Sequence, residues 1–225
     1  MILIFDTYNW TKIQGGSYMD NTPNILISLP EEANLQLPSP ELVNFYNDLK
    51  TRTFWIDSEI DENSLSLVQY ILQWNREDLG IPVEERKPIR LLFYSMGGSL
   101  DVEETLVSMI KLSKTPIYGI ALGVVASAAS LIYLACHKRY AFPNAYFVLH
   151  KGSCNNIGGN FNEVQAAMED YRAQIEKMEK FYIENTTYPE EVIKEKIKTD
   201  WYIHIEEAVQ FNIVNEVLEN IDVLL

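Results

Sequence analysis

Cysteine and histidine are scarce in this sequence. Two cysteines among 225 residues cannot form a disulfide framework, and they fall far short of the ligands of a structural zinc site. We therefore expect no metal, and a reducing compartment, the cytoplasm, fits best. The chain has only three histidines, His137, His150 and His204, that can serve a hydrolase as general base.

Basic residues are few as well. Eighteen lysines and arginines stand against 32 aspartates and glutamates, which gives a net charge of −14. A surface this acidic repels phosphate groups, so we expect no nucleic acid partner. Hydrophobic residues at 47% and aromatic residues at 12% can form a buried core, which excludes wholesale disorder.

Long apolar stretches are almost absent. The exception is the uncharged run of 22 residues over 115–136, which is long enough to span a bilayer. Pro116, Gly119 and Gly123 interrupt this run, and a buried strand followed by a buried helix explains it equally well, so we expect no membrane association. The first residues lack a basic stretch and reach Asp6 early, so no secretory signal is expected.

Strand-like and helix-like segments alternate through the rest of the chain. The sequence predicts strands over 53–56, 89–94, 117–122 and 146–149, helices from Ser64, around 102–110 and over 127–136, and shorter elements over 192–197, 201–205 and 206–211. Strands separated by helices pair in parallel, which predicts an α/β protein with active groups at strand ends. The first 40 residues contain four prolines and predict little regular structure.

A long helix is expected after Gly158-Gly159, where Asn160 and Glu163 form a capping box. Apolar residues then recur at spacings of three and four, as in a heptad seam, at Phe161, Val164, Met168, Tyr171, Ile175, Met178 and Tyr182. Such a helix is roughly 35 Å long. Two interpretations remain open, namely a helix lying on its own core and a helix projecting towards another subunit.

A candidate nucleophile lies in a run of small residues, Gly123 to Ser130. Ser127 follows a predicted strand and opens a helix, where backbone N–H groups can stabilise an oxyanion, although serine there is also an ordinary N-cap. His150 ends a strand before Lys151-Gly152, either facing a cleft or bonded at a sheet edge. Residues 116–160 contain no Asp or Glu, so a carboxylate partner must come from a distant segment.

Four segments together resemble the ClpP family of self-compartmentalised serine proteases, within the ClpP/crotonase fold of repeated ββα units. Ser95-Met96-Gly97-Gly98 resembles that family's Ser-Pro-Gly-Gly, and the segment from Gly123 to Ala128 resembles its nucleophile motif. Residues 143–150 resemble the strand ending in the catalytic histidine, and residues 200–208 resemble the segment with the catalytic aspartate. The similarity covers about residues 50–219, in the same order and at similar spacing.

The resemblance implies the roles of individual residues. Ser127 would be the nucleophile, His150 the general base and Asp200 the orienting carboxylate, with the amides of Gly98 and Ala128 forming the oxyanion hole. Met96, Gly97 and Val124 would contact substrate, and a medium-sized apolar side chain before the scissile bond is expected. Residues 41–225 would form the protease domain, with a protruding handle helix over about 160–185, and residues 1–40 a divergent segment.

The resemblance also implies an assembly of stacked heptameric rings, a tetradecamer that cleaves unfolded polypeptides through an acyl-enzyme. No cofactor is expected, since ATP would be used only by a possible ClpX- or ClpA-like unfoldase. Met96 stands where the family has proline, Ala128 where it has methionine, and residues 1–50 do not resemble its axial loop, so unfoldase docking stays open. Two alternatives also stay open: a non-proteolytic subunit that needs an active paralogue, and a crotonase-like acyl-CoA enzyme.

Overall fold

The computed structural model describes residues 2–3, 27–28, 39–154 and 157–224. The chain divides into two compact units, Met1–Val43 and Asn44–Leu225. In the first unit, β1 (Ile2–Leu3) and β2 (Ile27–Ser28) form an antiparallel pair. The predicted irregular segment over residues 1–40 lies mostly outside the described residues.

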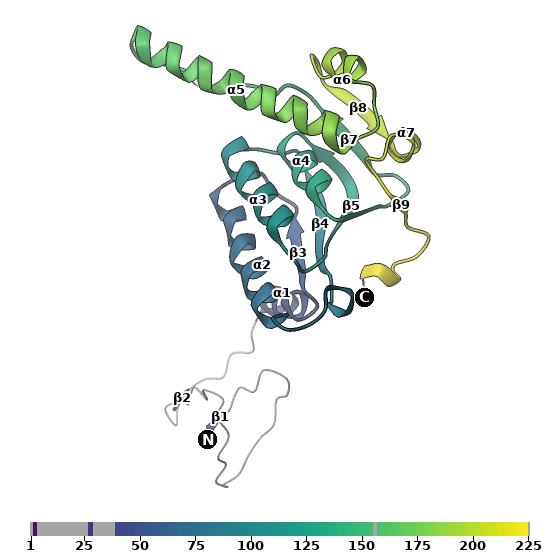
Figure 1. Cartoon of the computed structure of the whole chain (residues 1–225). Helices are drawn as coiled ribbons and strands as arrows, with labels where there is room; N and C mark the ends of the chain where they lie inside the picture. Colours follow the sequence, from purple (N-terminus) through teal and green to yellow (C-terminus); the bar gives the residue numbers. More distant parts are fainter. Residues whose placement is uncertain (1, 4–26, 29–38, 155–156, 225) are drawn as a thin grey trace. The chain divides into compact units, whose positions relative to one another are not determined.

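A mixed sheet of seven strands forms the centre of the second unit (Figure 1). Its path runs β3–β4–β5–β6–β9, and β7 pairs with both β5 and β8. Neighbours are parallel except β7 and β8, which are antiparallel. The strands are β3 (Thr53–Ile56), β4 (Ile89–Ser95), β5 (Ile117–Ala126), β6 (Lys138–Ala141), β7 (Tyr146–Leu149), β8 (Trp201–His204) and β9 (Glu216–Val217). The predicted α/β class is confirmed.

Successive side chains along each strand point to opposite faces of the sheet. On β4, Leu91 and Phe93 are fully buried in the main core, whereas Leu92 packs in a small cluster on the other face with Ile120 and Tyr140. Helices α2, α3 and α4 complete the main core on one face. The helices are α1 (Pro40–Lys50), α2 (Ser66–Glu77), α3 (Leu100–Leu112), α4 (Ala128–Ala135), α5 (Phe161–Asn185), α6 (Glu190–Lys196) and α7 (Ile205–Gln210), with 3-10 turns at Glu62–Leu65, Val83–Glu85 and Asp222–Leu224.

The central strand β5 is longer than the sequence predicts. Its pairing with β4 shifts register between Phe93, which lies opposite Ala121, and Ser95, which lies opposite Val125. Before this irregularity β5 pairs with β6, and after it β5 pairs with β7. The predicted end of this strand at residue 122 is therefore wrong, because a bulged strand continues to Ala126 and pairs with two neighbours in succession.

The predicted long helix is present as α5, which contains 25 residues and begins with the predicted capping box of Asn160 and Glu163. Its C-terminal half packs on the core, where Met178 and Tyr182 are 4% and 0% exposed. Its N-terminal half extends away from the sheet (Figure 1), and Phe161 is 81% exposed. No helix within the described ranges has both the length and the apolar character needed to cross a membrane.

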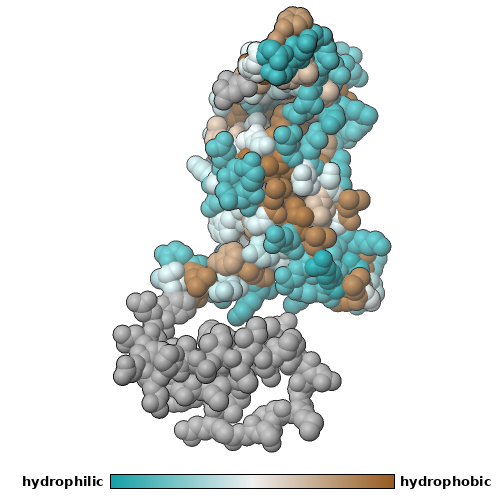
Figure 2. All heavy atoms as spheres, turned by 90° about the vertical axis from the view of Figure 1, so that its left-hand side faces the viewer, coloured by the Kyte–Doolittle hydropathy of each residue, from teal (hydrophilic) through white to brown (hydrophobic). Residues whose placement is uncertain are grey.

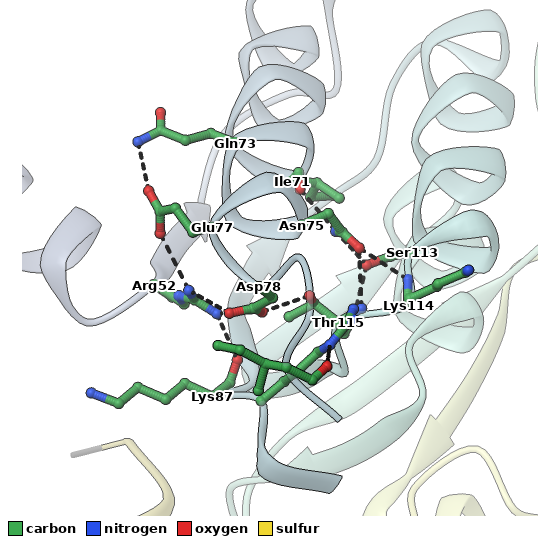
Figure 3. Close-up of polar contacts among 12 residues, drawn as sticks. Arg52, Ile71, Gln73, Asn75, Glu77, Asp78, Lys87, Ser113, Lys114 and Thr115 are labelled. Atoms are coloured by element: carbon green, nitrogen blue, oxygen red, sulfur yellow. Dashed lines mark hydrogen bonds and ion pairs between the residues drawn. The ribbon is translucent and has the colours of Figure 1, made fainter. Parts of the chain in front are cut away.

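A buried ion pair joins the amino ends of β3 and β5 (Figure 3). Arg52 donates to both carboxylate oxygens of Asp78 at 2.8 and 2.9 Å, and the Thr115 hydroxyl donates to Asp78 at 2.7 Å. Burial alone would raise the pKa of Asp78, but the hydrogen bonds from Arg52 and Thr115 and the Arg52 charge outweigh it and lower the pKa. The pair therefore stabilises the fold at neutral pH, and this contribution is lost as the pH falls through the lowered pKa.

We expect Asp78→Asn to lower the free energy of unfolding by about 3–5 kcal/mol, because it removes the buried carboxylate and leaves Arg52 only the half-exposed Glu77 as a counter-charge. Urea denaturation near neutral pH measures this loss. Glu77→Gln is the matched control, since Glu77 also pairs with Arg52 but is 47% exposed, and its cost should stay below about 1 kcal/mol. Equal losses in the two variants would contradict the assignment of the ion pair.

Candidate active site

Ser127 lies at the turn between β5 and α4 in a strained backbone conformation. Its φ of 52° and ψ of −130° are rarely adopted by residues other than glycine. The Ser127 N–H donates to the carbonyl of Val148 at 2.9 Å, so β7 holds the turn in place. Because β5 ends at Ala126 and α4 begins at Ala128, one residue reverses the chain and presents its hydroxyl at the start of a helix.

Two glycines after β4 pack closely around this turn. A side-chain carbon on Gly97 would lie 2.6 Å from Ser127 Cβ and 2.8 Å from the Ala126 carbonyl oxygen, and the φ of Gly97 is +98°. A side-chain carbon on Gly98 would overlap the Ile60 backbone, with φ at +155°. Only glycine fits either position, and Gly97 is in direct contact with the Ser127 turn.

Ser95 holds the glycine turn in a way that its place in the motif does not reveal. This residue is 3% exposed, and its hydroxyl donates to the Ser58 carbonyl at 2.5 Å. The same oxygen accepts the Gly97 N–H at 3.1 Å. The Gly97 amide is therefore occupied, and the turn is fixed to the segment that follows β3.

His150 and Asp200 meet because β7 and β8 are antiparallel. Leu149, the last residue of β7, lies opposite Trp201, the first residue of β8. His150 follows Leu149 and Asp200 precedes Trp201, so these two residues also face one another. His150 Nε2 lies 2.7 Å from Ser127 Oγ, and His150 Nδ1 lies 3.4 Å from Asp200 Oδ1. The structure thus brings together the three side chains that the sequence places at 127, 150 and 200, and the carboxylate does come from outside the acid-free stretch.

Two backbone amides near Ser127 are available to a ligand. The Ala128 N–H opens α4 and has no acceptor within the helix, where the helix dipole also favours negative charge. The Gly98 N–H makes no hydrogen bond among the described residues. These are the two amides that the sequence analysis selects for an oxyanion hole.

The three expected substrate contacts differ in exposure. Met96 is 69% exposed and open to a peptide, whereas Gly97 is buried against the Ser127 turn. Val124 is only 6% exposed and packs with Ala126 and Val148 behind the turn. Within residues 39–154 and 157–224, no three His, Cys, Asp or Glu side chains lie close enough to share a metal ion.

Comparison with known proteins identifies the family. The model of the family described as Clp protease matches residues 39–221. The chain belongs to the Clp protease family. It is 29% identical to the ATP-dependent Clp protease proteolytic subunit 2 of Treponema denticola over 175 residues, which cover 76% of this chain and 84% of that protein. Its identity to the proteolytic subunit 2 of Pseudomonas aeruginosa is 30% over 179 residues, with 76% and 82% covered.

A solved structure supports the same assignment. A point mutant of ClpP1 from Listeria monocytogenes superposes with a TM-score of 0.66 at 28% identity, covering 80% of this chain and 98% of that one. The chain is accordingly a serine-type peptidase with the Clp protease fold. The match over residues 39–221 includes Ser127, His150 and Asp200.

In this Clp family chain a buried hydrogen-bond chain ties the Ser127 turn to α5. The Ser130 hydroxyl donates to the Ser127 carbonyl at 2.6 Å, and the Tyr182 hydroxyl lies 3.0 Å from Ser130 Oγ. Because Ser130 donates its proton to Ser127, Tyr182 donates to Ser130. Neither role was predicted from the sequence, although Ser130 lies one helical turn after Ser127 and Tyr182 ends the heptad seam.

We expect Ser130→Ala and Tyr182→Phe to be coupled in a double-mutant cycle. The two residues share a buried hydrogen bond, so their effects on the free energy of unfolding should depart from additivity by about 1 kcal/mol. The control cycle pairs Ser130→Ala with Tyr188→Phe, whose hydroxyl binds Glu207 instead. Additive effects in the first cycle, or equal coupling in both, would contradict the hydrogen-bond chain.

Proposed function

We propose that this protein is a serine endopeptidase of ClpP type that cleaves unfolded polypeptides through a Ser127–His150–Asp200 triad. The observation that carries the proposal is the 2.7 Å approach of His150 Nε2 to Ser127 Oγ, with Asp200 on the other ring nitrogen. A nucleophile, a base and an orienting group in this order are what acyl transfer by serine requires.

The proposed reaction begins when Ser127 Oγ attacks the peptide carbonyl and His150 Nε2 takes the hydroxyl proton. The carbonyl oxygen becomes negative and receives the N–H groups of Gly98 and Ala128. Collapse of this tetrahedral species breaks the C–N bond, His150 passes its proton to the leaving amine, and Ser127 holds the acyl group. Water then attacks the ester with His150 again as base, which releases the acid and restores the serine.

Asp200 orients the base rather than taking a proton. Its contact with Nδ1 favours the tautomer that leaves Nε2 free to accept, and its charge stabilises the imidazolium that forms. The Asp200 side chain is 60% exposed in the single chain.

Self-association into stacked rings is part of the proposal. The N-terminal half of α5 carries an apolar seam that its own chain leaves open, because Phe161 is 81% and Met168 45% exposed. Figure 2, which faces the side where α5 begins, shows an apolar group at the top of the molecule among mainly hydrophilic atoms, and a separate apolar band lower down. A second copy is the partner that a heptad seam of this kind fits. Docking of a ClpX- or ClpA-like unfoldase remains an expectation from the family.

We expect a fluorophosphonate probe to add once to each wild-type chain and not at all to Ser127→Ala. Intact-mass spectrometry counts the adducts, and native mass spectrometry of both proteins checks that assembly is unchanged. Cleavage of unfolded casein should disappear in the same variant, by at least about a thousandfold. Unchanged cleavage by Ser127→Ala would refute the triad. No adduct on a well-assembled wild-type oligomer would instead favour a non-proteolytic subunit that needs an active paralogue.

The seam predicts a second experiment, on assembly. Met168→Glu places a charge in the apolar seam and should shift the native mass distribution to smaller species by at least about tenfold, since a buried unpaired charge is costly. Ala167→Glu introduces the same charge at the adjacent exposed position, outside the seam, and should leave the distribution unchanged. An unaltered distribution in Met168→Glu would show that the seam is not an interface.

A further inference from the structure

A cavity of about 210 Å³ lies between α3 and α5, and nothing in the proposed chemistry has used it. Most of its wall is apolar. The lining side chains include Leu100 and Val107 of α3, Leu131 of α4, and Met178 and Phe181 of α5.

Three residues that line the cavity lie close in the chain to residues at the proposed active site. Leu100 follows the oxyanion glycine Gly98 by two residues, and Leu131 lies one turn of α4 beyond Ser127. On α5, Met178 lies one turn before Tyr182, whose hydroxyl reaches Ser130 beside the Ser127 turn. The side chain before the scissile bond of a peptide bound at Ser127 can extend towards this open cavity, since Leu100 and Leu131 lie close in the chain to Gly98 and Ser127.

Glu103 is the one acidic side chain buried in this wall. It is 6% exposed, and none of the hydrogen bonds or ion pairs among the described residues uses its carboxyl oxygens. Its sequence neighbours on the same helical face, Leu106, Val107 and Ile110, are all buried apolar residues. A carboxyl in such a position that lacks a partner in its own chain has unused acceptors for a ligand.

The charged groups around Glu103 come from two helices. Burial, reinforced by the Glu104 charge, raises its pKa to about 8, while Lys111 of α3 and Lys177 of α5 act weakly in the opposite direction. Lys177 is engaged by Glu104 at 3.0 Å across the rim, and Gln174 contacts Asp101 there, so neither α5 group neutralises the buried carboxyl. From α4 the cavity receives only the apolar Leu131.

We propose that this cavity is the pocket for the substrate side chain before the scissile bond, and that Glu103 makes it select a lysine or arginine. The inference rests on the proposed peptidase function. The apolar wall accommodates the aliphatic stem of such a side chain, and its cationic end forms a buried, charge-assisted hydrogen bond with the carboxylate. This replaces the expectation of a purely apolar side chain at that position.

Binding of a cation by this pocket is coupled to release of a proton. At neutral pH the empty pocket holds Glu103 mainly protonated, because its pKa is about 8. A bound ammonium or guanidinium favours the carboxylate, so the proton leaves to solvent as the side chain enters. The KM for a cationic side chain must therefore fall as the pH rises towards that pKa, by up to about tenfold for each pH unit. An uncharged side chain of equal length shows no such fall.

The test compares two fluorogenic peptides that differ only in the residue before the scissile bond, lysine or its uncharged analogue norleucine. The ratio of their kcat/KM values cancels pH effects on the triad itself. For the wild-type oligomer we expect the ratio to favour lysine and to rise at least about tenfold between about pH 6 and about pH 8. Glu103→Gln should lower the ratio at least about tenfold and remove its pH dependence. Glu176→Gln, the same substitution at an exposed position of α5 outside the cavity lining, should alter it less than about twofold.

A ratio that favours norleucine at every pH, or that responds equally to both variants, would overturn the proposal. A second measurement separates it from the peptidase proposal. Calorimetry with Ser127→Ala and the two uncleaved peptides measures binding without turnover. Lysine-selective, pH-dependent binding, together with no hydrolysis by the wild-type protein, would refute the peptidase proposal and support the pocket proposal. Hydrolysis by the wild-type protein without lysine selectivity would support the peptidase proposal and refute the pocket proposal.

Discussion

The contact between Gly97 and Ser127 is the constraint on which the rest of the site depends. Gly97 has no room for a side chain because the Ser127 Cβ and the Ala126 carbonyl oxygen occupy the space. This approach holds the ends of β4 and β5 together and helps to over-determine the strained backbone of Ser127, which costs of order 1–3 kcal/mol on its own. Ser95, Val148 and Ser130 add hydrogen bonds around the same turn. The proposed nucleophile is therefore positioned by backbone packing, and its hydroxyl has His150 as its hydrogen-bond partner.

Local pattern was enough to predict most elements, because apolar periodicity decides which face of a strand or helix is buried. It could not predict pairings between distant segments. The strand β6 is short and begins with Lys138 and Arg139, so its composition carries no strand signal. The bulge that extends β5 to Ala126 depends on tertiary contacts, since a side chain on Gly123 would meet the Tyr94 ring at 2.8 Å. The antiparallel pairing of β7 and β8, which brings His150 to Asp200, joins segments 50 residues apart and was accessible only through family resemblance.

The two halves of α5 have different surroundings, and the helix would connect the proposed assembly with the site. Its C-terminal half supplies Tyr182 to the Ser127 turn and Met178 to the cavity wall, and both side chains are buried. Its N-terminal half carries the open seam. The interpretation of a helix lying on its own core is therefore confirmed for the C-terminal half, and packing of the N-terminal half on another subunit stays a proposal. The pattern alone could not separate them, since a heptad seam reports that apolar residues share a face and not what covers that face.

Glu103 shows why an unfavourable residue can persist beside a site. The folded state keeps its proton up to about pH 8, whereas the unfolded chain loses it near the ordinary value of 4.5. Stability therefore falls as the pH rises from about 4.5 to about 8, and the penalty is complete above that range. A leucine there, matching Leu106, Val107 and Ile110, would remove the penalty permanently. A bound cationic side chain of the substrate offsets this penalty, and an uncharged side chain does not. The free energy that destabilises the empty protein therefore favours binding of cationic over uncharged substrates. A helix position that lowers stability is thus the one that gives the proposed pocket its selectivity.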